Sequence, residues 1–195
     1  MTDVVPAADA HAVLPDGVTY LPADTAGQRA VEELLDRCER EVGGLPHAVC
    51  CHAGVAASHP VQEFPLDEFD RLVRVNLRGS YVLARAASAR WVAAGQPGQL
   101  VFTTSWVSDV PWPGIAPYSA TKAALKSLTR SFARELAPRG IRANAVAPGI
   151  VAVGMAKRQW DTEPDTFLYL LSPLASYVTG SVLVVDGGAS LYPMD

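Results

Sequence analysis

The sequence of 195 residues predicts an α/β fold in which helices flank a mostly parallel β-sheet. Two observations support this: several short runs are almost continuously apolar, which is typical of strands buried on both faces of a sheet, and helical patterns lie between them. Strands that alternate with helices in this way favour parallel pairing. The predicted strands are VTYLPA (18–23), HAVCCHAG (47–54), QLVFTTS (99–105), the weaker IRANAVAPG (141–149) and SVLVVDGG (181–188).

Three helices are predicted from the spacing of apolar residues. Their patterns place apolar side chains on one face, and glycine or proline follows the first and the third. The predicted helices cover residues 27–42, 66–94 and 116–137. Since no repeat, linker or low-complexity tract divides the chain, we expect a single domain over residues 1–195.

Composition narrows the class of protein. Apolar residues make up 49% of the chain and charged residues 18%, which predicts a folded protein. The net charge of −4 argues against nucleic acid as the main partner. No apolar run reaches the roughly 18 residues of a membrane span, and the first residues lack the pattern of a signal peptide, so we expect a cytoplasmic protein without membrane contact. The three cysteines and four histidines show no metal-ligand spacing, which predicts no metal site.

A chemical site is predicted where strand 99–105 ends. Ligands of open α/β sheets lie beyond the carboxyl ends of the strands, where Ser105 stands. Tyr118 and Lys122 are one helical turn apart at the start of the next helix, so they share a face. A tyrosine that titrates near about pH 10 becomes a useful acid or base when a neighbouring cation lowers its pKa. The three side chains are therefore candidates for proton transfer to an oxygen.

The same segment resembles the short-chain dehydrogenase/reductases. The resemblance rests on TTSWVSDVPWPGIAPYSATKAALKSLTRSFARELAPRGIRANAVAPG, on VNLRGSYVL, on ASYVTGSVLVVDGG and on residues 18–54. It implies a truncated, Rossmann-like, doubly wound sheet and an oxidoreductase that interconverts a ketone and an alcohol. It also implies that Tyr118 is the acid/base, Lys122 lowers its pKa, Ser105 orients the reacting oxygen and Asn76 supports a proton-relay water.

Each of these residues also has a purely structural reading. Asn76 can cap or bend a helix, and Ser105 can simply end a strand. Lys122 can be a solvated helix residue, and Tyr118 can be a core residue with its hydroxyl satisfied.

The cofactor side departs from the family pattern. Two strand–helix units, roughly 60 residues, should precede VTYLPA, but 17 residues stand there and they hold no glycine-rich phosphate-binding turn. We therefore expect residues 1–17 to be an atypical segment. The resemblance implies NAD or NADP, whereas the missing turn argues against dinucleotide binding. Cofactor contacts are predicted at Asp24, Gly54, Pro148 and Gly149; Asp24 can instead cap the helix that follows it.

The predicted substrate side is short. Residues 156–175 leave room for little more than one helix of the lid that the family folds there. We expect a small apolar carbonyl or hydroxyl compound in a pocket lined by Trp106, Trp112 and Trp160, although core packing is the commoner role of a single tryptophan.

Three functions remain open from the sequence. The first is the oxidoreductase, and the second is a redox-neutral isomerase, dehydratase or cyclase that uses the same tyrosine and lysine. The third is a non-catalytic subunit. Strand 47–54 would lose a neighbour if two strands are missing, and an exposed apolar edge needs cover. Either residues 18–23 pair with it or a second chain covers it. The resemblance of the two long helices to the family's dimer interface predicts a homodimer or homotetramer.

Overall fold

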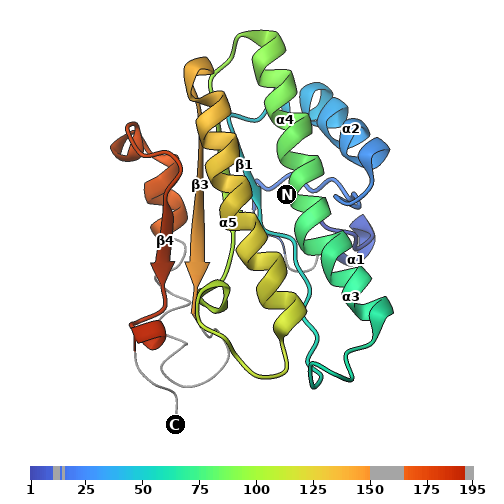
Figure 1. Cartoon of the computed structure of the whole chain (residues 1–195). Helices are drawn as coiled ribbons and strands as arrows, with labels where there is room; N and C mark the ends of the chain where they lie inside the picture. The colour runs from blue at the N-terminus through green and yellow to red at the C-terminus, as the bar shows by residue number, and fades with distance from the viewer. Residues whose placement is uncertain (11–13, 15, 150–164, 192–195) are drawn as a thin grey trace.

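The protein is described by a computed structural model, which covers residues 1–10, 14, 16–149 and 165–191. Over these ranges it has a Rossmann-like parallel sheet of four strands in the order β1-β2-β3-β4 (Figure 1). Every neighbouring pair is parallel, so the carboxyl ends of the strands meet at one edge of the sheet. The strands are β1 (Ala48–Cys51), β2 (Gly98–Thr103), β3 (Ile141–Pro148) and β4 (Val182–Val185).

The predicted helices are confirmed, two of them with a change of winding. Residues 27–42 form an α-helix that ends in a π-helical turn, and residues 66–94 form one long helix with a π-helical segment in its middle. The described helices are α1 (Ala7–Ala10), α2 (Gln28–Arg37), η2 (Cys38–Val42), α3 (Leu66–Leu72), η3 (Val73–Gly79), α4 (Ser80–Ala94) and α5 (Ala116–Leu136). Short 3-10 turns are η4 (Trp106–Ser108), η5 (Ala137–Arg139), η6 (Pro173–Ala175) and η7 (Ala189–Leu191).

Helices cover both faces of the sheet. In Figure 1, α4 and α5 lie side by side in front of the strands. Their buried side chains join one face of β2 and β3 in the larger core cluster, which includes Trp91, Phe102 and Leu125. The helical residues 165–171 supply Leu170 to a smaller cluster, which contains Val101 of β2. Because adjacent strand residues face opposite ways, Val101 and Phe102 mark the two covered faces.

The prediction of a strand at residues 18–23 is wrong. This segment is extended and buries Tyr20 and Leu21, but it does not join the sheet. It bonds the N-terminal segment instead, with Leu21 N donating to Met1 O at 3.0 Å and Ala23 N donating to Asp3 O at 2.9 Å. The apolar residues of segment 18–23 are therefore buried without pairing as a strand of the sheet. It does not cover β1, whose one strand partner in the described sheet is β2.

Candidate active site

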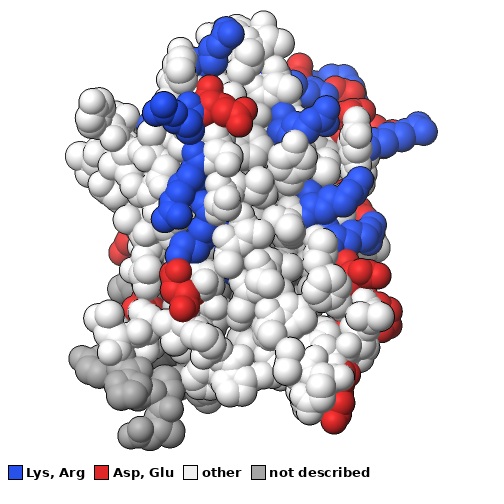
Figure 2. All heavy atoms as spheres, in the orientation of Figure 1, with Lys and Arg blue, Asp and Glu red and all other residues white. Residues whose placement is uncertain are grey.

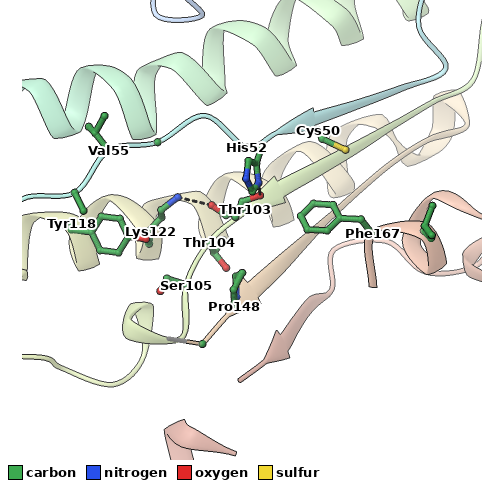
Figure 3. Close-up of a pocket in the computed structure, with 14 residues that line it drawn as sticks. Cys50, His52, Val55, Thr103, Thr104, Ser105, Tyr118, Lys122, Pro148 and Phe167 are labelled. Atoms are coloured by element: carbon green, nitrogen blue, oxygen red, sulfur yellow. Dashed lines mark hydrogen bonds between the residues drawn. The ribbon is translucent and has the colours of Figure 1, made fainter. Parts of the chain in front are cut away.

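A cavity of about 750 Å³ opens at the carboxyl ends of β1, β2 and β3 (Figure 3). Its position matches the edge at which open parallel sheets bind ligands. Six of the predicted site residues line it, from the segments after β1 and β2, from α5 and from the end of β3: Gly54, Ser105, Tyr118, Lys122, Pro148 and Gly149. The lining residues are Cys50, His52, Gly54, Val55, Ala56, Thr103, Thr104, Ser105, Tyr118, Lys122, Pro148, Gly149, Phe167 and Leu168.

The first turns of α5 place Tyr118 and Lys122 on the cavity wall. Proline at position 117 suits the first turn of a helix, where a missing backbone N–H costs nothing. The spacing of four residues then puts both side chains on one face, and Lys122 Nζ lies 5.6 Å from the centre of the Tyr118 ring. The predicted pairing of the two side chains is therefore present in the fold.

The Lys122 side chain is buried, and its ammonium is held by the end of β2. Nζ donates to the carbonyl oxygen of Thr103 at 2.8 Å. Burial lowers the pKa of Lys122 from 10.5 to about 8, because removing the ammonium from water disfavours its charged form. An ammonium has three N–H groups, so this bond leaves two donors for a ligand in the cavity.

The Tyr118 hydroxyl lies near Ser105, but its pKa differs from the expectation. Burial raises the pKa of Tyr118 above its usual value, and the hydrogen bond with the Ser105 side chain acts in the opposite direction with a smaller effect. The predicted lowering of the Tyr118 pKa by Lys122 is thus wrong for this structure, because the loss of hydration on burial is the largest effect on the hydroxyl. At neutral pH the hydroxyl keeps its proton.

Asn76 ties the segment after β1 to two helices. It lies fully buried in η3, and its amide bonds the backbone of Val55 in both directions: Val55 N donates to Oδ1 at 2.8 Å, and Nδ2 donates to Val55 O at 2.9 Å. Nδ2 also lies 3.2 Å from Thr121 Oγ1 on α5. π-Helical turns are frequent at functional sites because they redirect side chains. The proton-relay role of Asn76 stays a prediction.

His52 and Thr103 belong to the cavity but were not proposed as site residues from the sequence. His52 Nδ1 lies 2.9 Å from Thr103 Oγ1, and its ring meets the Phe167 ring edge-on at 6.1 Å. Thr103 therefore contacts His52 through its side chain and Lys122 through its carbonyl oxygen. The position of His52 near the carboxyl end of the predicted strand 47–54 was the available signal for it.

Three further predicted residues lie elsewhere. Asp24 does not line the cavity; Oδ1 accepts the Ala26 N–H at 2.9 Å in the turn before α2, and Oδ2 pairs with Arg74. Trp106 is buried and packs against Trp112 at 5.7 Å, and neither residue lines the cavity. Trp160 falls outside the described residues.

Several residues of the cavity could hold part of a nicotinamide cofactor. A Cβ at Gly54 would stand 3.3 Å from Asn76 Oδ1 and 3.5 Å from Lys122 Nζ, so glycine keeps this space open. The two remaining N–H groups of Lys122 suit ribose hydroxyls, and Pro148 and Val55 offer apolar contacts to a ring. In the segments that follow β1 and β2, no helix begins directly after a glycine-rich turn. These segments therefore lack the backbone N–H groups with which such a turn binds the pyrophosphate of a dinucleotide.

No group of three or more histidine, cysteine, aspartate or glutamate side chains is arranged to hold a metal ion in the described ranges. None of the helices described is both long enough and apolar enough to cross a bilayer.

The chain is similar to a known family of enzymes. Residues 4–164 match the sequence profile of the family described as short chain dehydrogenase. The chain is 33% identical over 192 residues to 3beta-hydroxysteroid dehydrogenase 1 of Eggerthella lenta, covering 88% of this chain and 73% of the relative. It is 32% identical over 173 residues to carbonyl reductase [NADPH] 2 of Sus scrofa, covering 77% and 71%.

A solved structure gives the same result for the fold. 4-Hydroxyisoleucine dehydrogenase complexed with NADH and succinate superimposes with a TM-score of 0.78 at 28% identity, covering 87% of this chain and 81% of that chain. These relatives are dehydrogenases and reductases of small molecules, which supports an enzyme of the oxidoreductase class. The chain belongs to the short-chain dehydrogenase family.

Proposed function

We propose that this protein is an oxidoreductase that interconverts a ketone and an alcohol on a small molecule, with NAD or NADP as cofactor. One observation carries the proposal: Tyr118, Lys122 and Ser105 meet on the wall of one cavity, with Asn76 directly behind it. A nicotinamide cofactor bound there supplies or accepts the hydride. The named residues of this chain do the rest.

The proton transfer falls to Tyr118. Its hydroxyl donates a proton to the carbonyl oxygen of a ketone and becomes tyrosinate; in the reverse direction the tyrosinate accepts the proton of an alcohol. The Ser105 hydroxyl holds the same oxygen by a hydrogen bond. Lys122 places a positive charge 5.6 Å from the tyrosine ring, which favours the tyrosinate that forms after proton donation. Asn76 fixes the loop opposite these groups through its two bonds to Val55.

The residues that line the cavity indicate the class of substrate. Val55, Ala56, Phe167 and Leu168 make much of the cavity apolar, while the polar groups converge at the end of β2. A small compound with an apolar body and one carbonyl or hydroxyl group satisfies both parts. The names of the relatives include a hydroxysteroid dehydrogenase and a carbonyl reductase, which fits this class.

The test is a titration of the purified protein with NADH and with NADPH, followed by tryptophan fluorescence and calorimetry. We expect micromolar binding of one of the two, and we expect Lys122→Ala to abolish it because the ammonium provides two donors to the ribose. Lys126→Ala is the matched control: it removes a charge one turn further along α5, where Lys126 pairs with Asp109 outside the cavity.

Absence of binding of either nucleotide at millimolar concentration would contradict the proposal. The tyrosine and lysine would then act without a hydride donor, and the redox-neutral enzyme would become the leading function. Its test is isomerisation, dehydration or cyclisation of the same class of carbonyl compounds.

We also propose that the protein forms a homodimer or homotetramer through α4 and α5. Figure 2 shows that the surface between these two helices carries few charged side chains. Tyr81 on α4 is 43% exposed there, and Phe69 on α3 is 40% exposed, so both add apolar surface that a second copy of the chain could cover. Light scattering coupled to gel filtration is expected to show at least a dimer; a monodisperse monomer would contradict this.

A further inference from the structure

A second cavity lies at the opposite edge of the sheet. It has a volume of about 700 Å³ and is lined by residues at the amino ends of β2 and β3, together with the turn around η6. The strands in Figure 1 point away from this edge, so the sheet separates the cavity from the proposed active site. Its size is in the range of small-molecule sites.

Among the described residues that line this cavity, Arg142 of β3 is the one arginine or lysine. Its guanidinium is fixed by three bonds to uncharged acceptors. Nη2 donates to Gln99 Oε1 at 2.7 Å and to Leu170 O at 3.0 Å, and Nη1 donates to Val178 O at 3.1 Å. A guanidinium has five N–H donors, so these bonds hold its plane while two donors stay available.

The charge of Arg142 is not balanced within the described chain. None of the described residues that line the cavity is an aspartate or glutamate, and Arg142 forms none of the ion pairs between described residues. Burial lowers the pKa of Arg142, with no acidic neighbour acting in the opposite direction. A partly buried cation held only by neutral groups costs stability unless an anion joins it.

The residues around Arg142 indicate what kind of ligand the cavity could hold. Pro97, Leu171 and Tyr177 are exposed or half-buried and present apolar surface, while His47 and Ser176 add polar groups. The two free N–H groups, on Nε and Nη1, point in different directions, so each can donate a single charge-assisted hydrogen bond to a carboxylate oxygen. A carboxylate with an attached ring or short apolar chain therefore matches both the charge and the surface.

We propose that this cavity is a binding site for a small carboxylic acid with an apolar body, and that Arg142 holds its carboxylate. The site is separate from the oxidoreductase site, and it stands whether or not that function is correct. His47 and Ser176 lie on the wall where they can add hydrogen bonds to the bound acid.

Benzoate is the probe, with benzyl alcohol as its uncharged counterpart and inorganic phosphate as an anion of different shape. Calorimetry on the purified protein is expected to show binding of benzoate and none of benzyl alcohol. Arg142→Gln is expected to weaken benzoate binding about tenfold or more, since hydrogen bonds to charged groups are lost. The matched control is Arg85→Gln on the exposed side of α4, which should bind benzoate like the wild type.

A second variant guards against misfolding, because Arg142 also links β3 to two other segments. Ser176→Glu keeps the three arginine bonds and adds a carboxylate at the wall, so it is expected to weaken benzoate binding to a similar degree. Unchanged binding in both variants would overturn the proposal, as would binding of phosphate in preference to benzoate. Benzoate binding that is lost with Lys122→Ala but survives Arg142→Gln would place the ligand in the first cavity and also overturn it.

Discussion

Replacing Tyr118 by phenylalanine is expected to lower kcat/KM for ketone reduction by about 10²–10⁴-fold, the usual contribution of a positioned general acid. The variant loses one hydroxyl and keeps the ring, so the packing of α5 should be unchanged. The loss therefore reports on proton donation rather than on folding. The measurement is the oxidation of NADPH or NADH in the presence of a ketone substrate, with unfolding curves recorded in parallel.

Tyr81→Phe is the matched control, since it removes the hydroxyl of an exposed tyrosine on α4. It should leave kcat/KM within about twofold.

The direction of the reaction should also depend on pH. Burial raises the pKa of Tyr118, so the hydroxyl is protonated at neutral pH and reduction is favoured there. Alcohol oxidation should accelerate as the pH rises toward that pKa. Full activity of Tyr118→Phe would exclude this residue as the acid/base.

Replacing Lys122 by methionine is expected to inactivate the protein and to stabilise it. Methionine fills a similar volume without a charge. Below about pH 8 the folded state must bury an ammonium whose pKa is about 8, against 10.5 in the unfolded chain. This penalty, less the lost bond to Thr103, suggests that the variant is about 1–3 kcal/mol more stable at neutral pH. Urea unfolding measures the difference.

The pH dependence of that difference has a definite sign. Between about 8 and 10.5 the unfolded chain binds more protons at this residue than the folded protein, so wild-type stability rises with pH. The methionine variant lacks this increase, and its advantage should shrink as the pH approaches 10.5. Lys126→Met, which removes a charge paired with Asp109, should show no such advantage. A methionine variant that is less stable at neutral pH would refute the expectation.

Local pattern was sufficient to predict most of the fold. Continuous apolar runs correctly identified β1 to β4, because a strand that is buried on both faces of a sheet is apolar at nearly every position. Apolar residues every three to four positions correctly identified the three long helices, because each helix buries one face. Residues 18–23 carry the same signal as a buried strand. Whether such a run joins the sheet depends on which backbone it meets, and here it meets residues 1–3.

The candidate site was predictable only where its geometry is local. Tyr118 and Lys122 share one helical face, so their spacing predicts their contact. Thr103 binds Lys122 across 19 residues and His52 across 51 residues, and no local pattern carries these contacts. The raised pKa of Tyr118 was missed for the same reason, since burial is a property of the whole cavity.

The number of residues in the π-helical segment η3 determines where Asn76 points relative to the core residues of α4. A π-helical turn holds one more residue than an α-helical turn, so Val73–Gly79 accommodates an extra residue between α3 and α4. Deleting one residue there would restore regular winding and rotate one half of the helix against the other by about 100°. Asn76 would then point away from Val55, or Trp91 would leave the core. In this segment, a single-residue deletion would therefore disturb the site or the core even where the removed side chain itself is exposed.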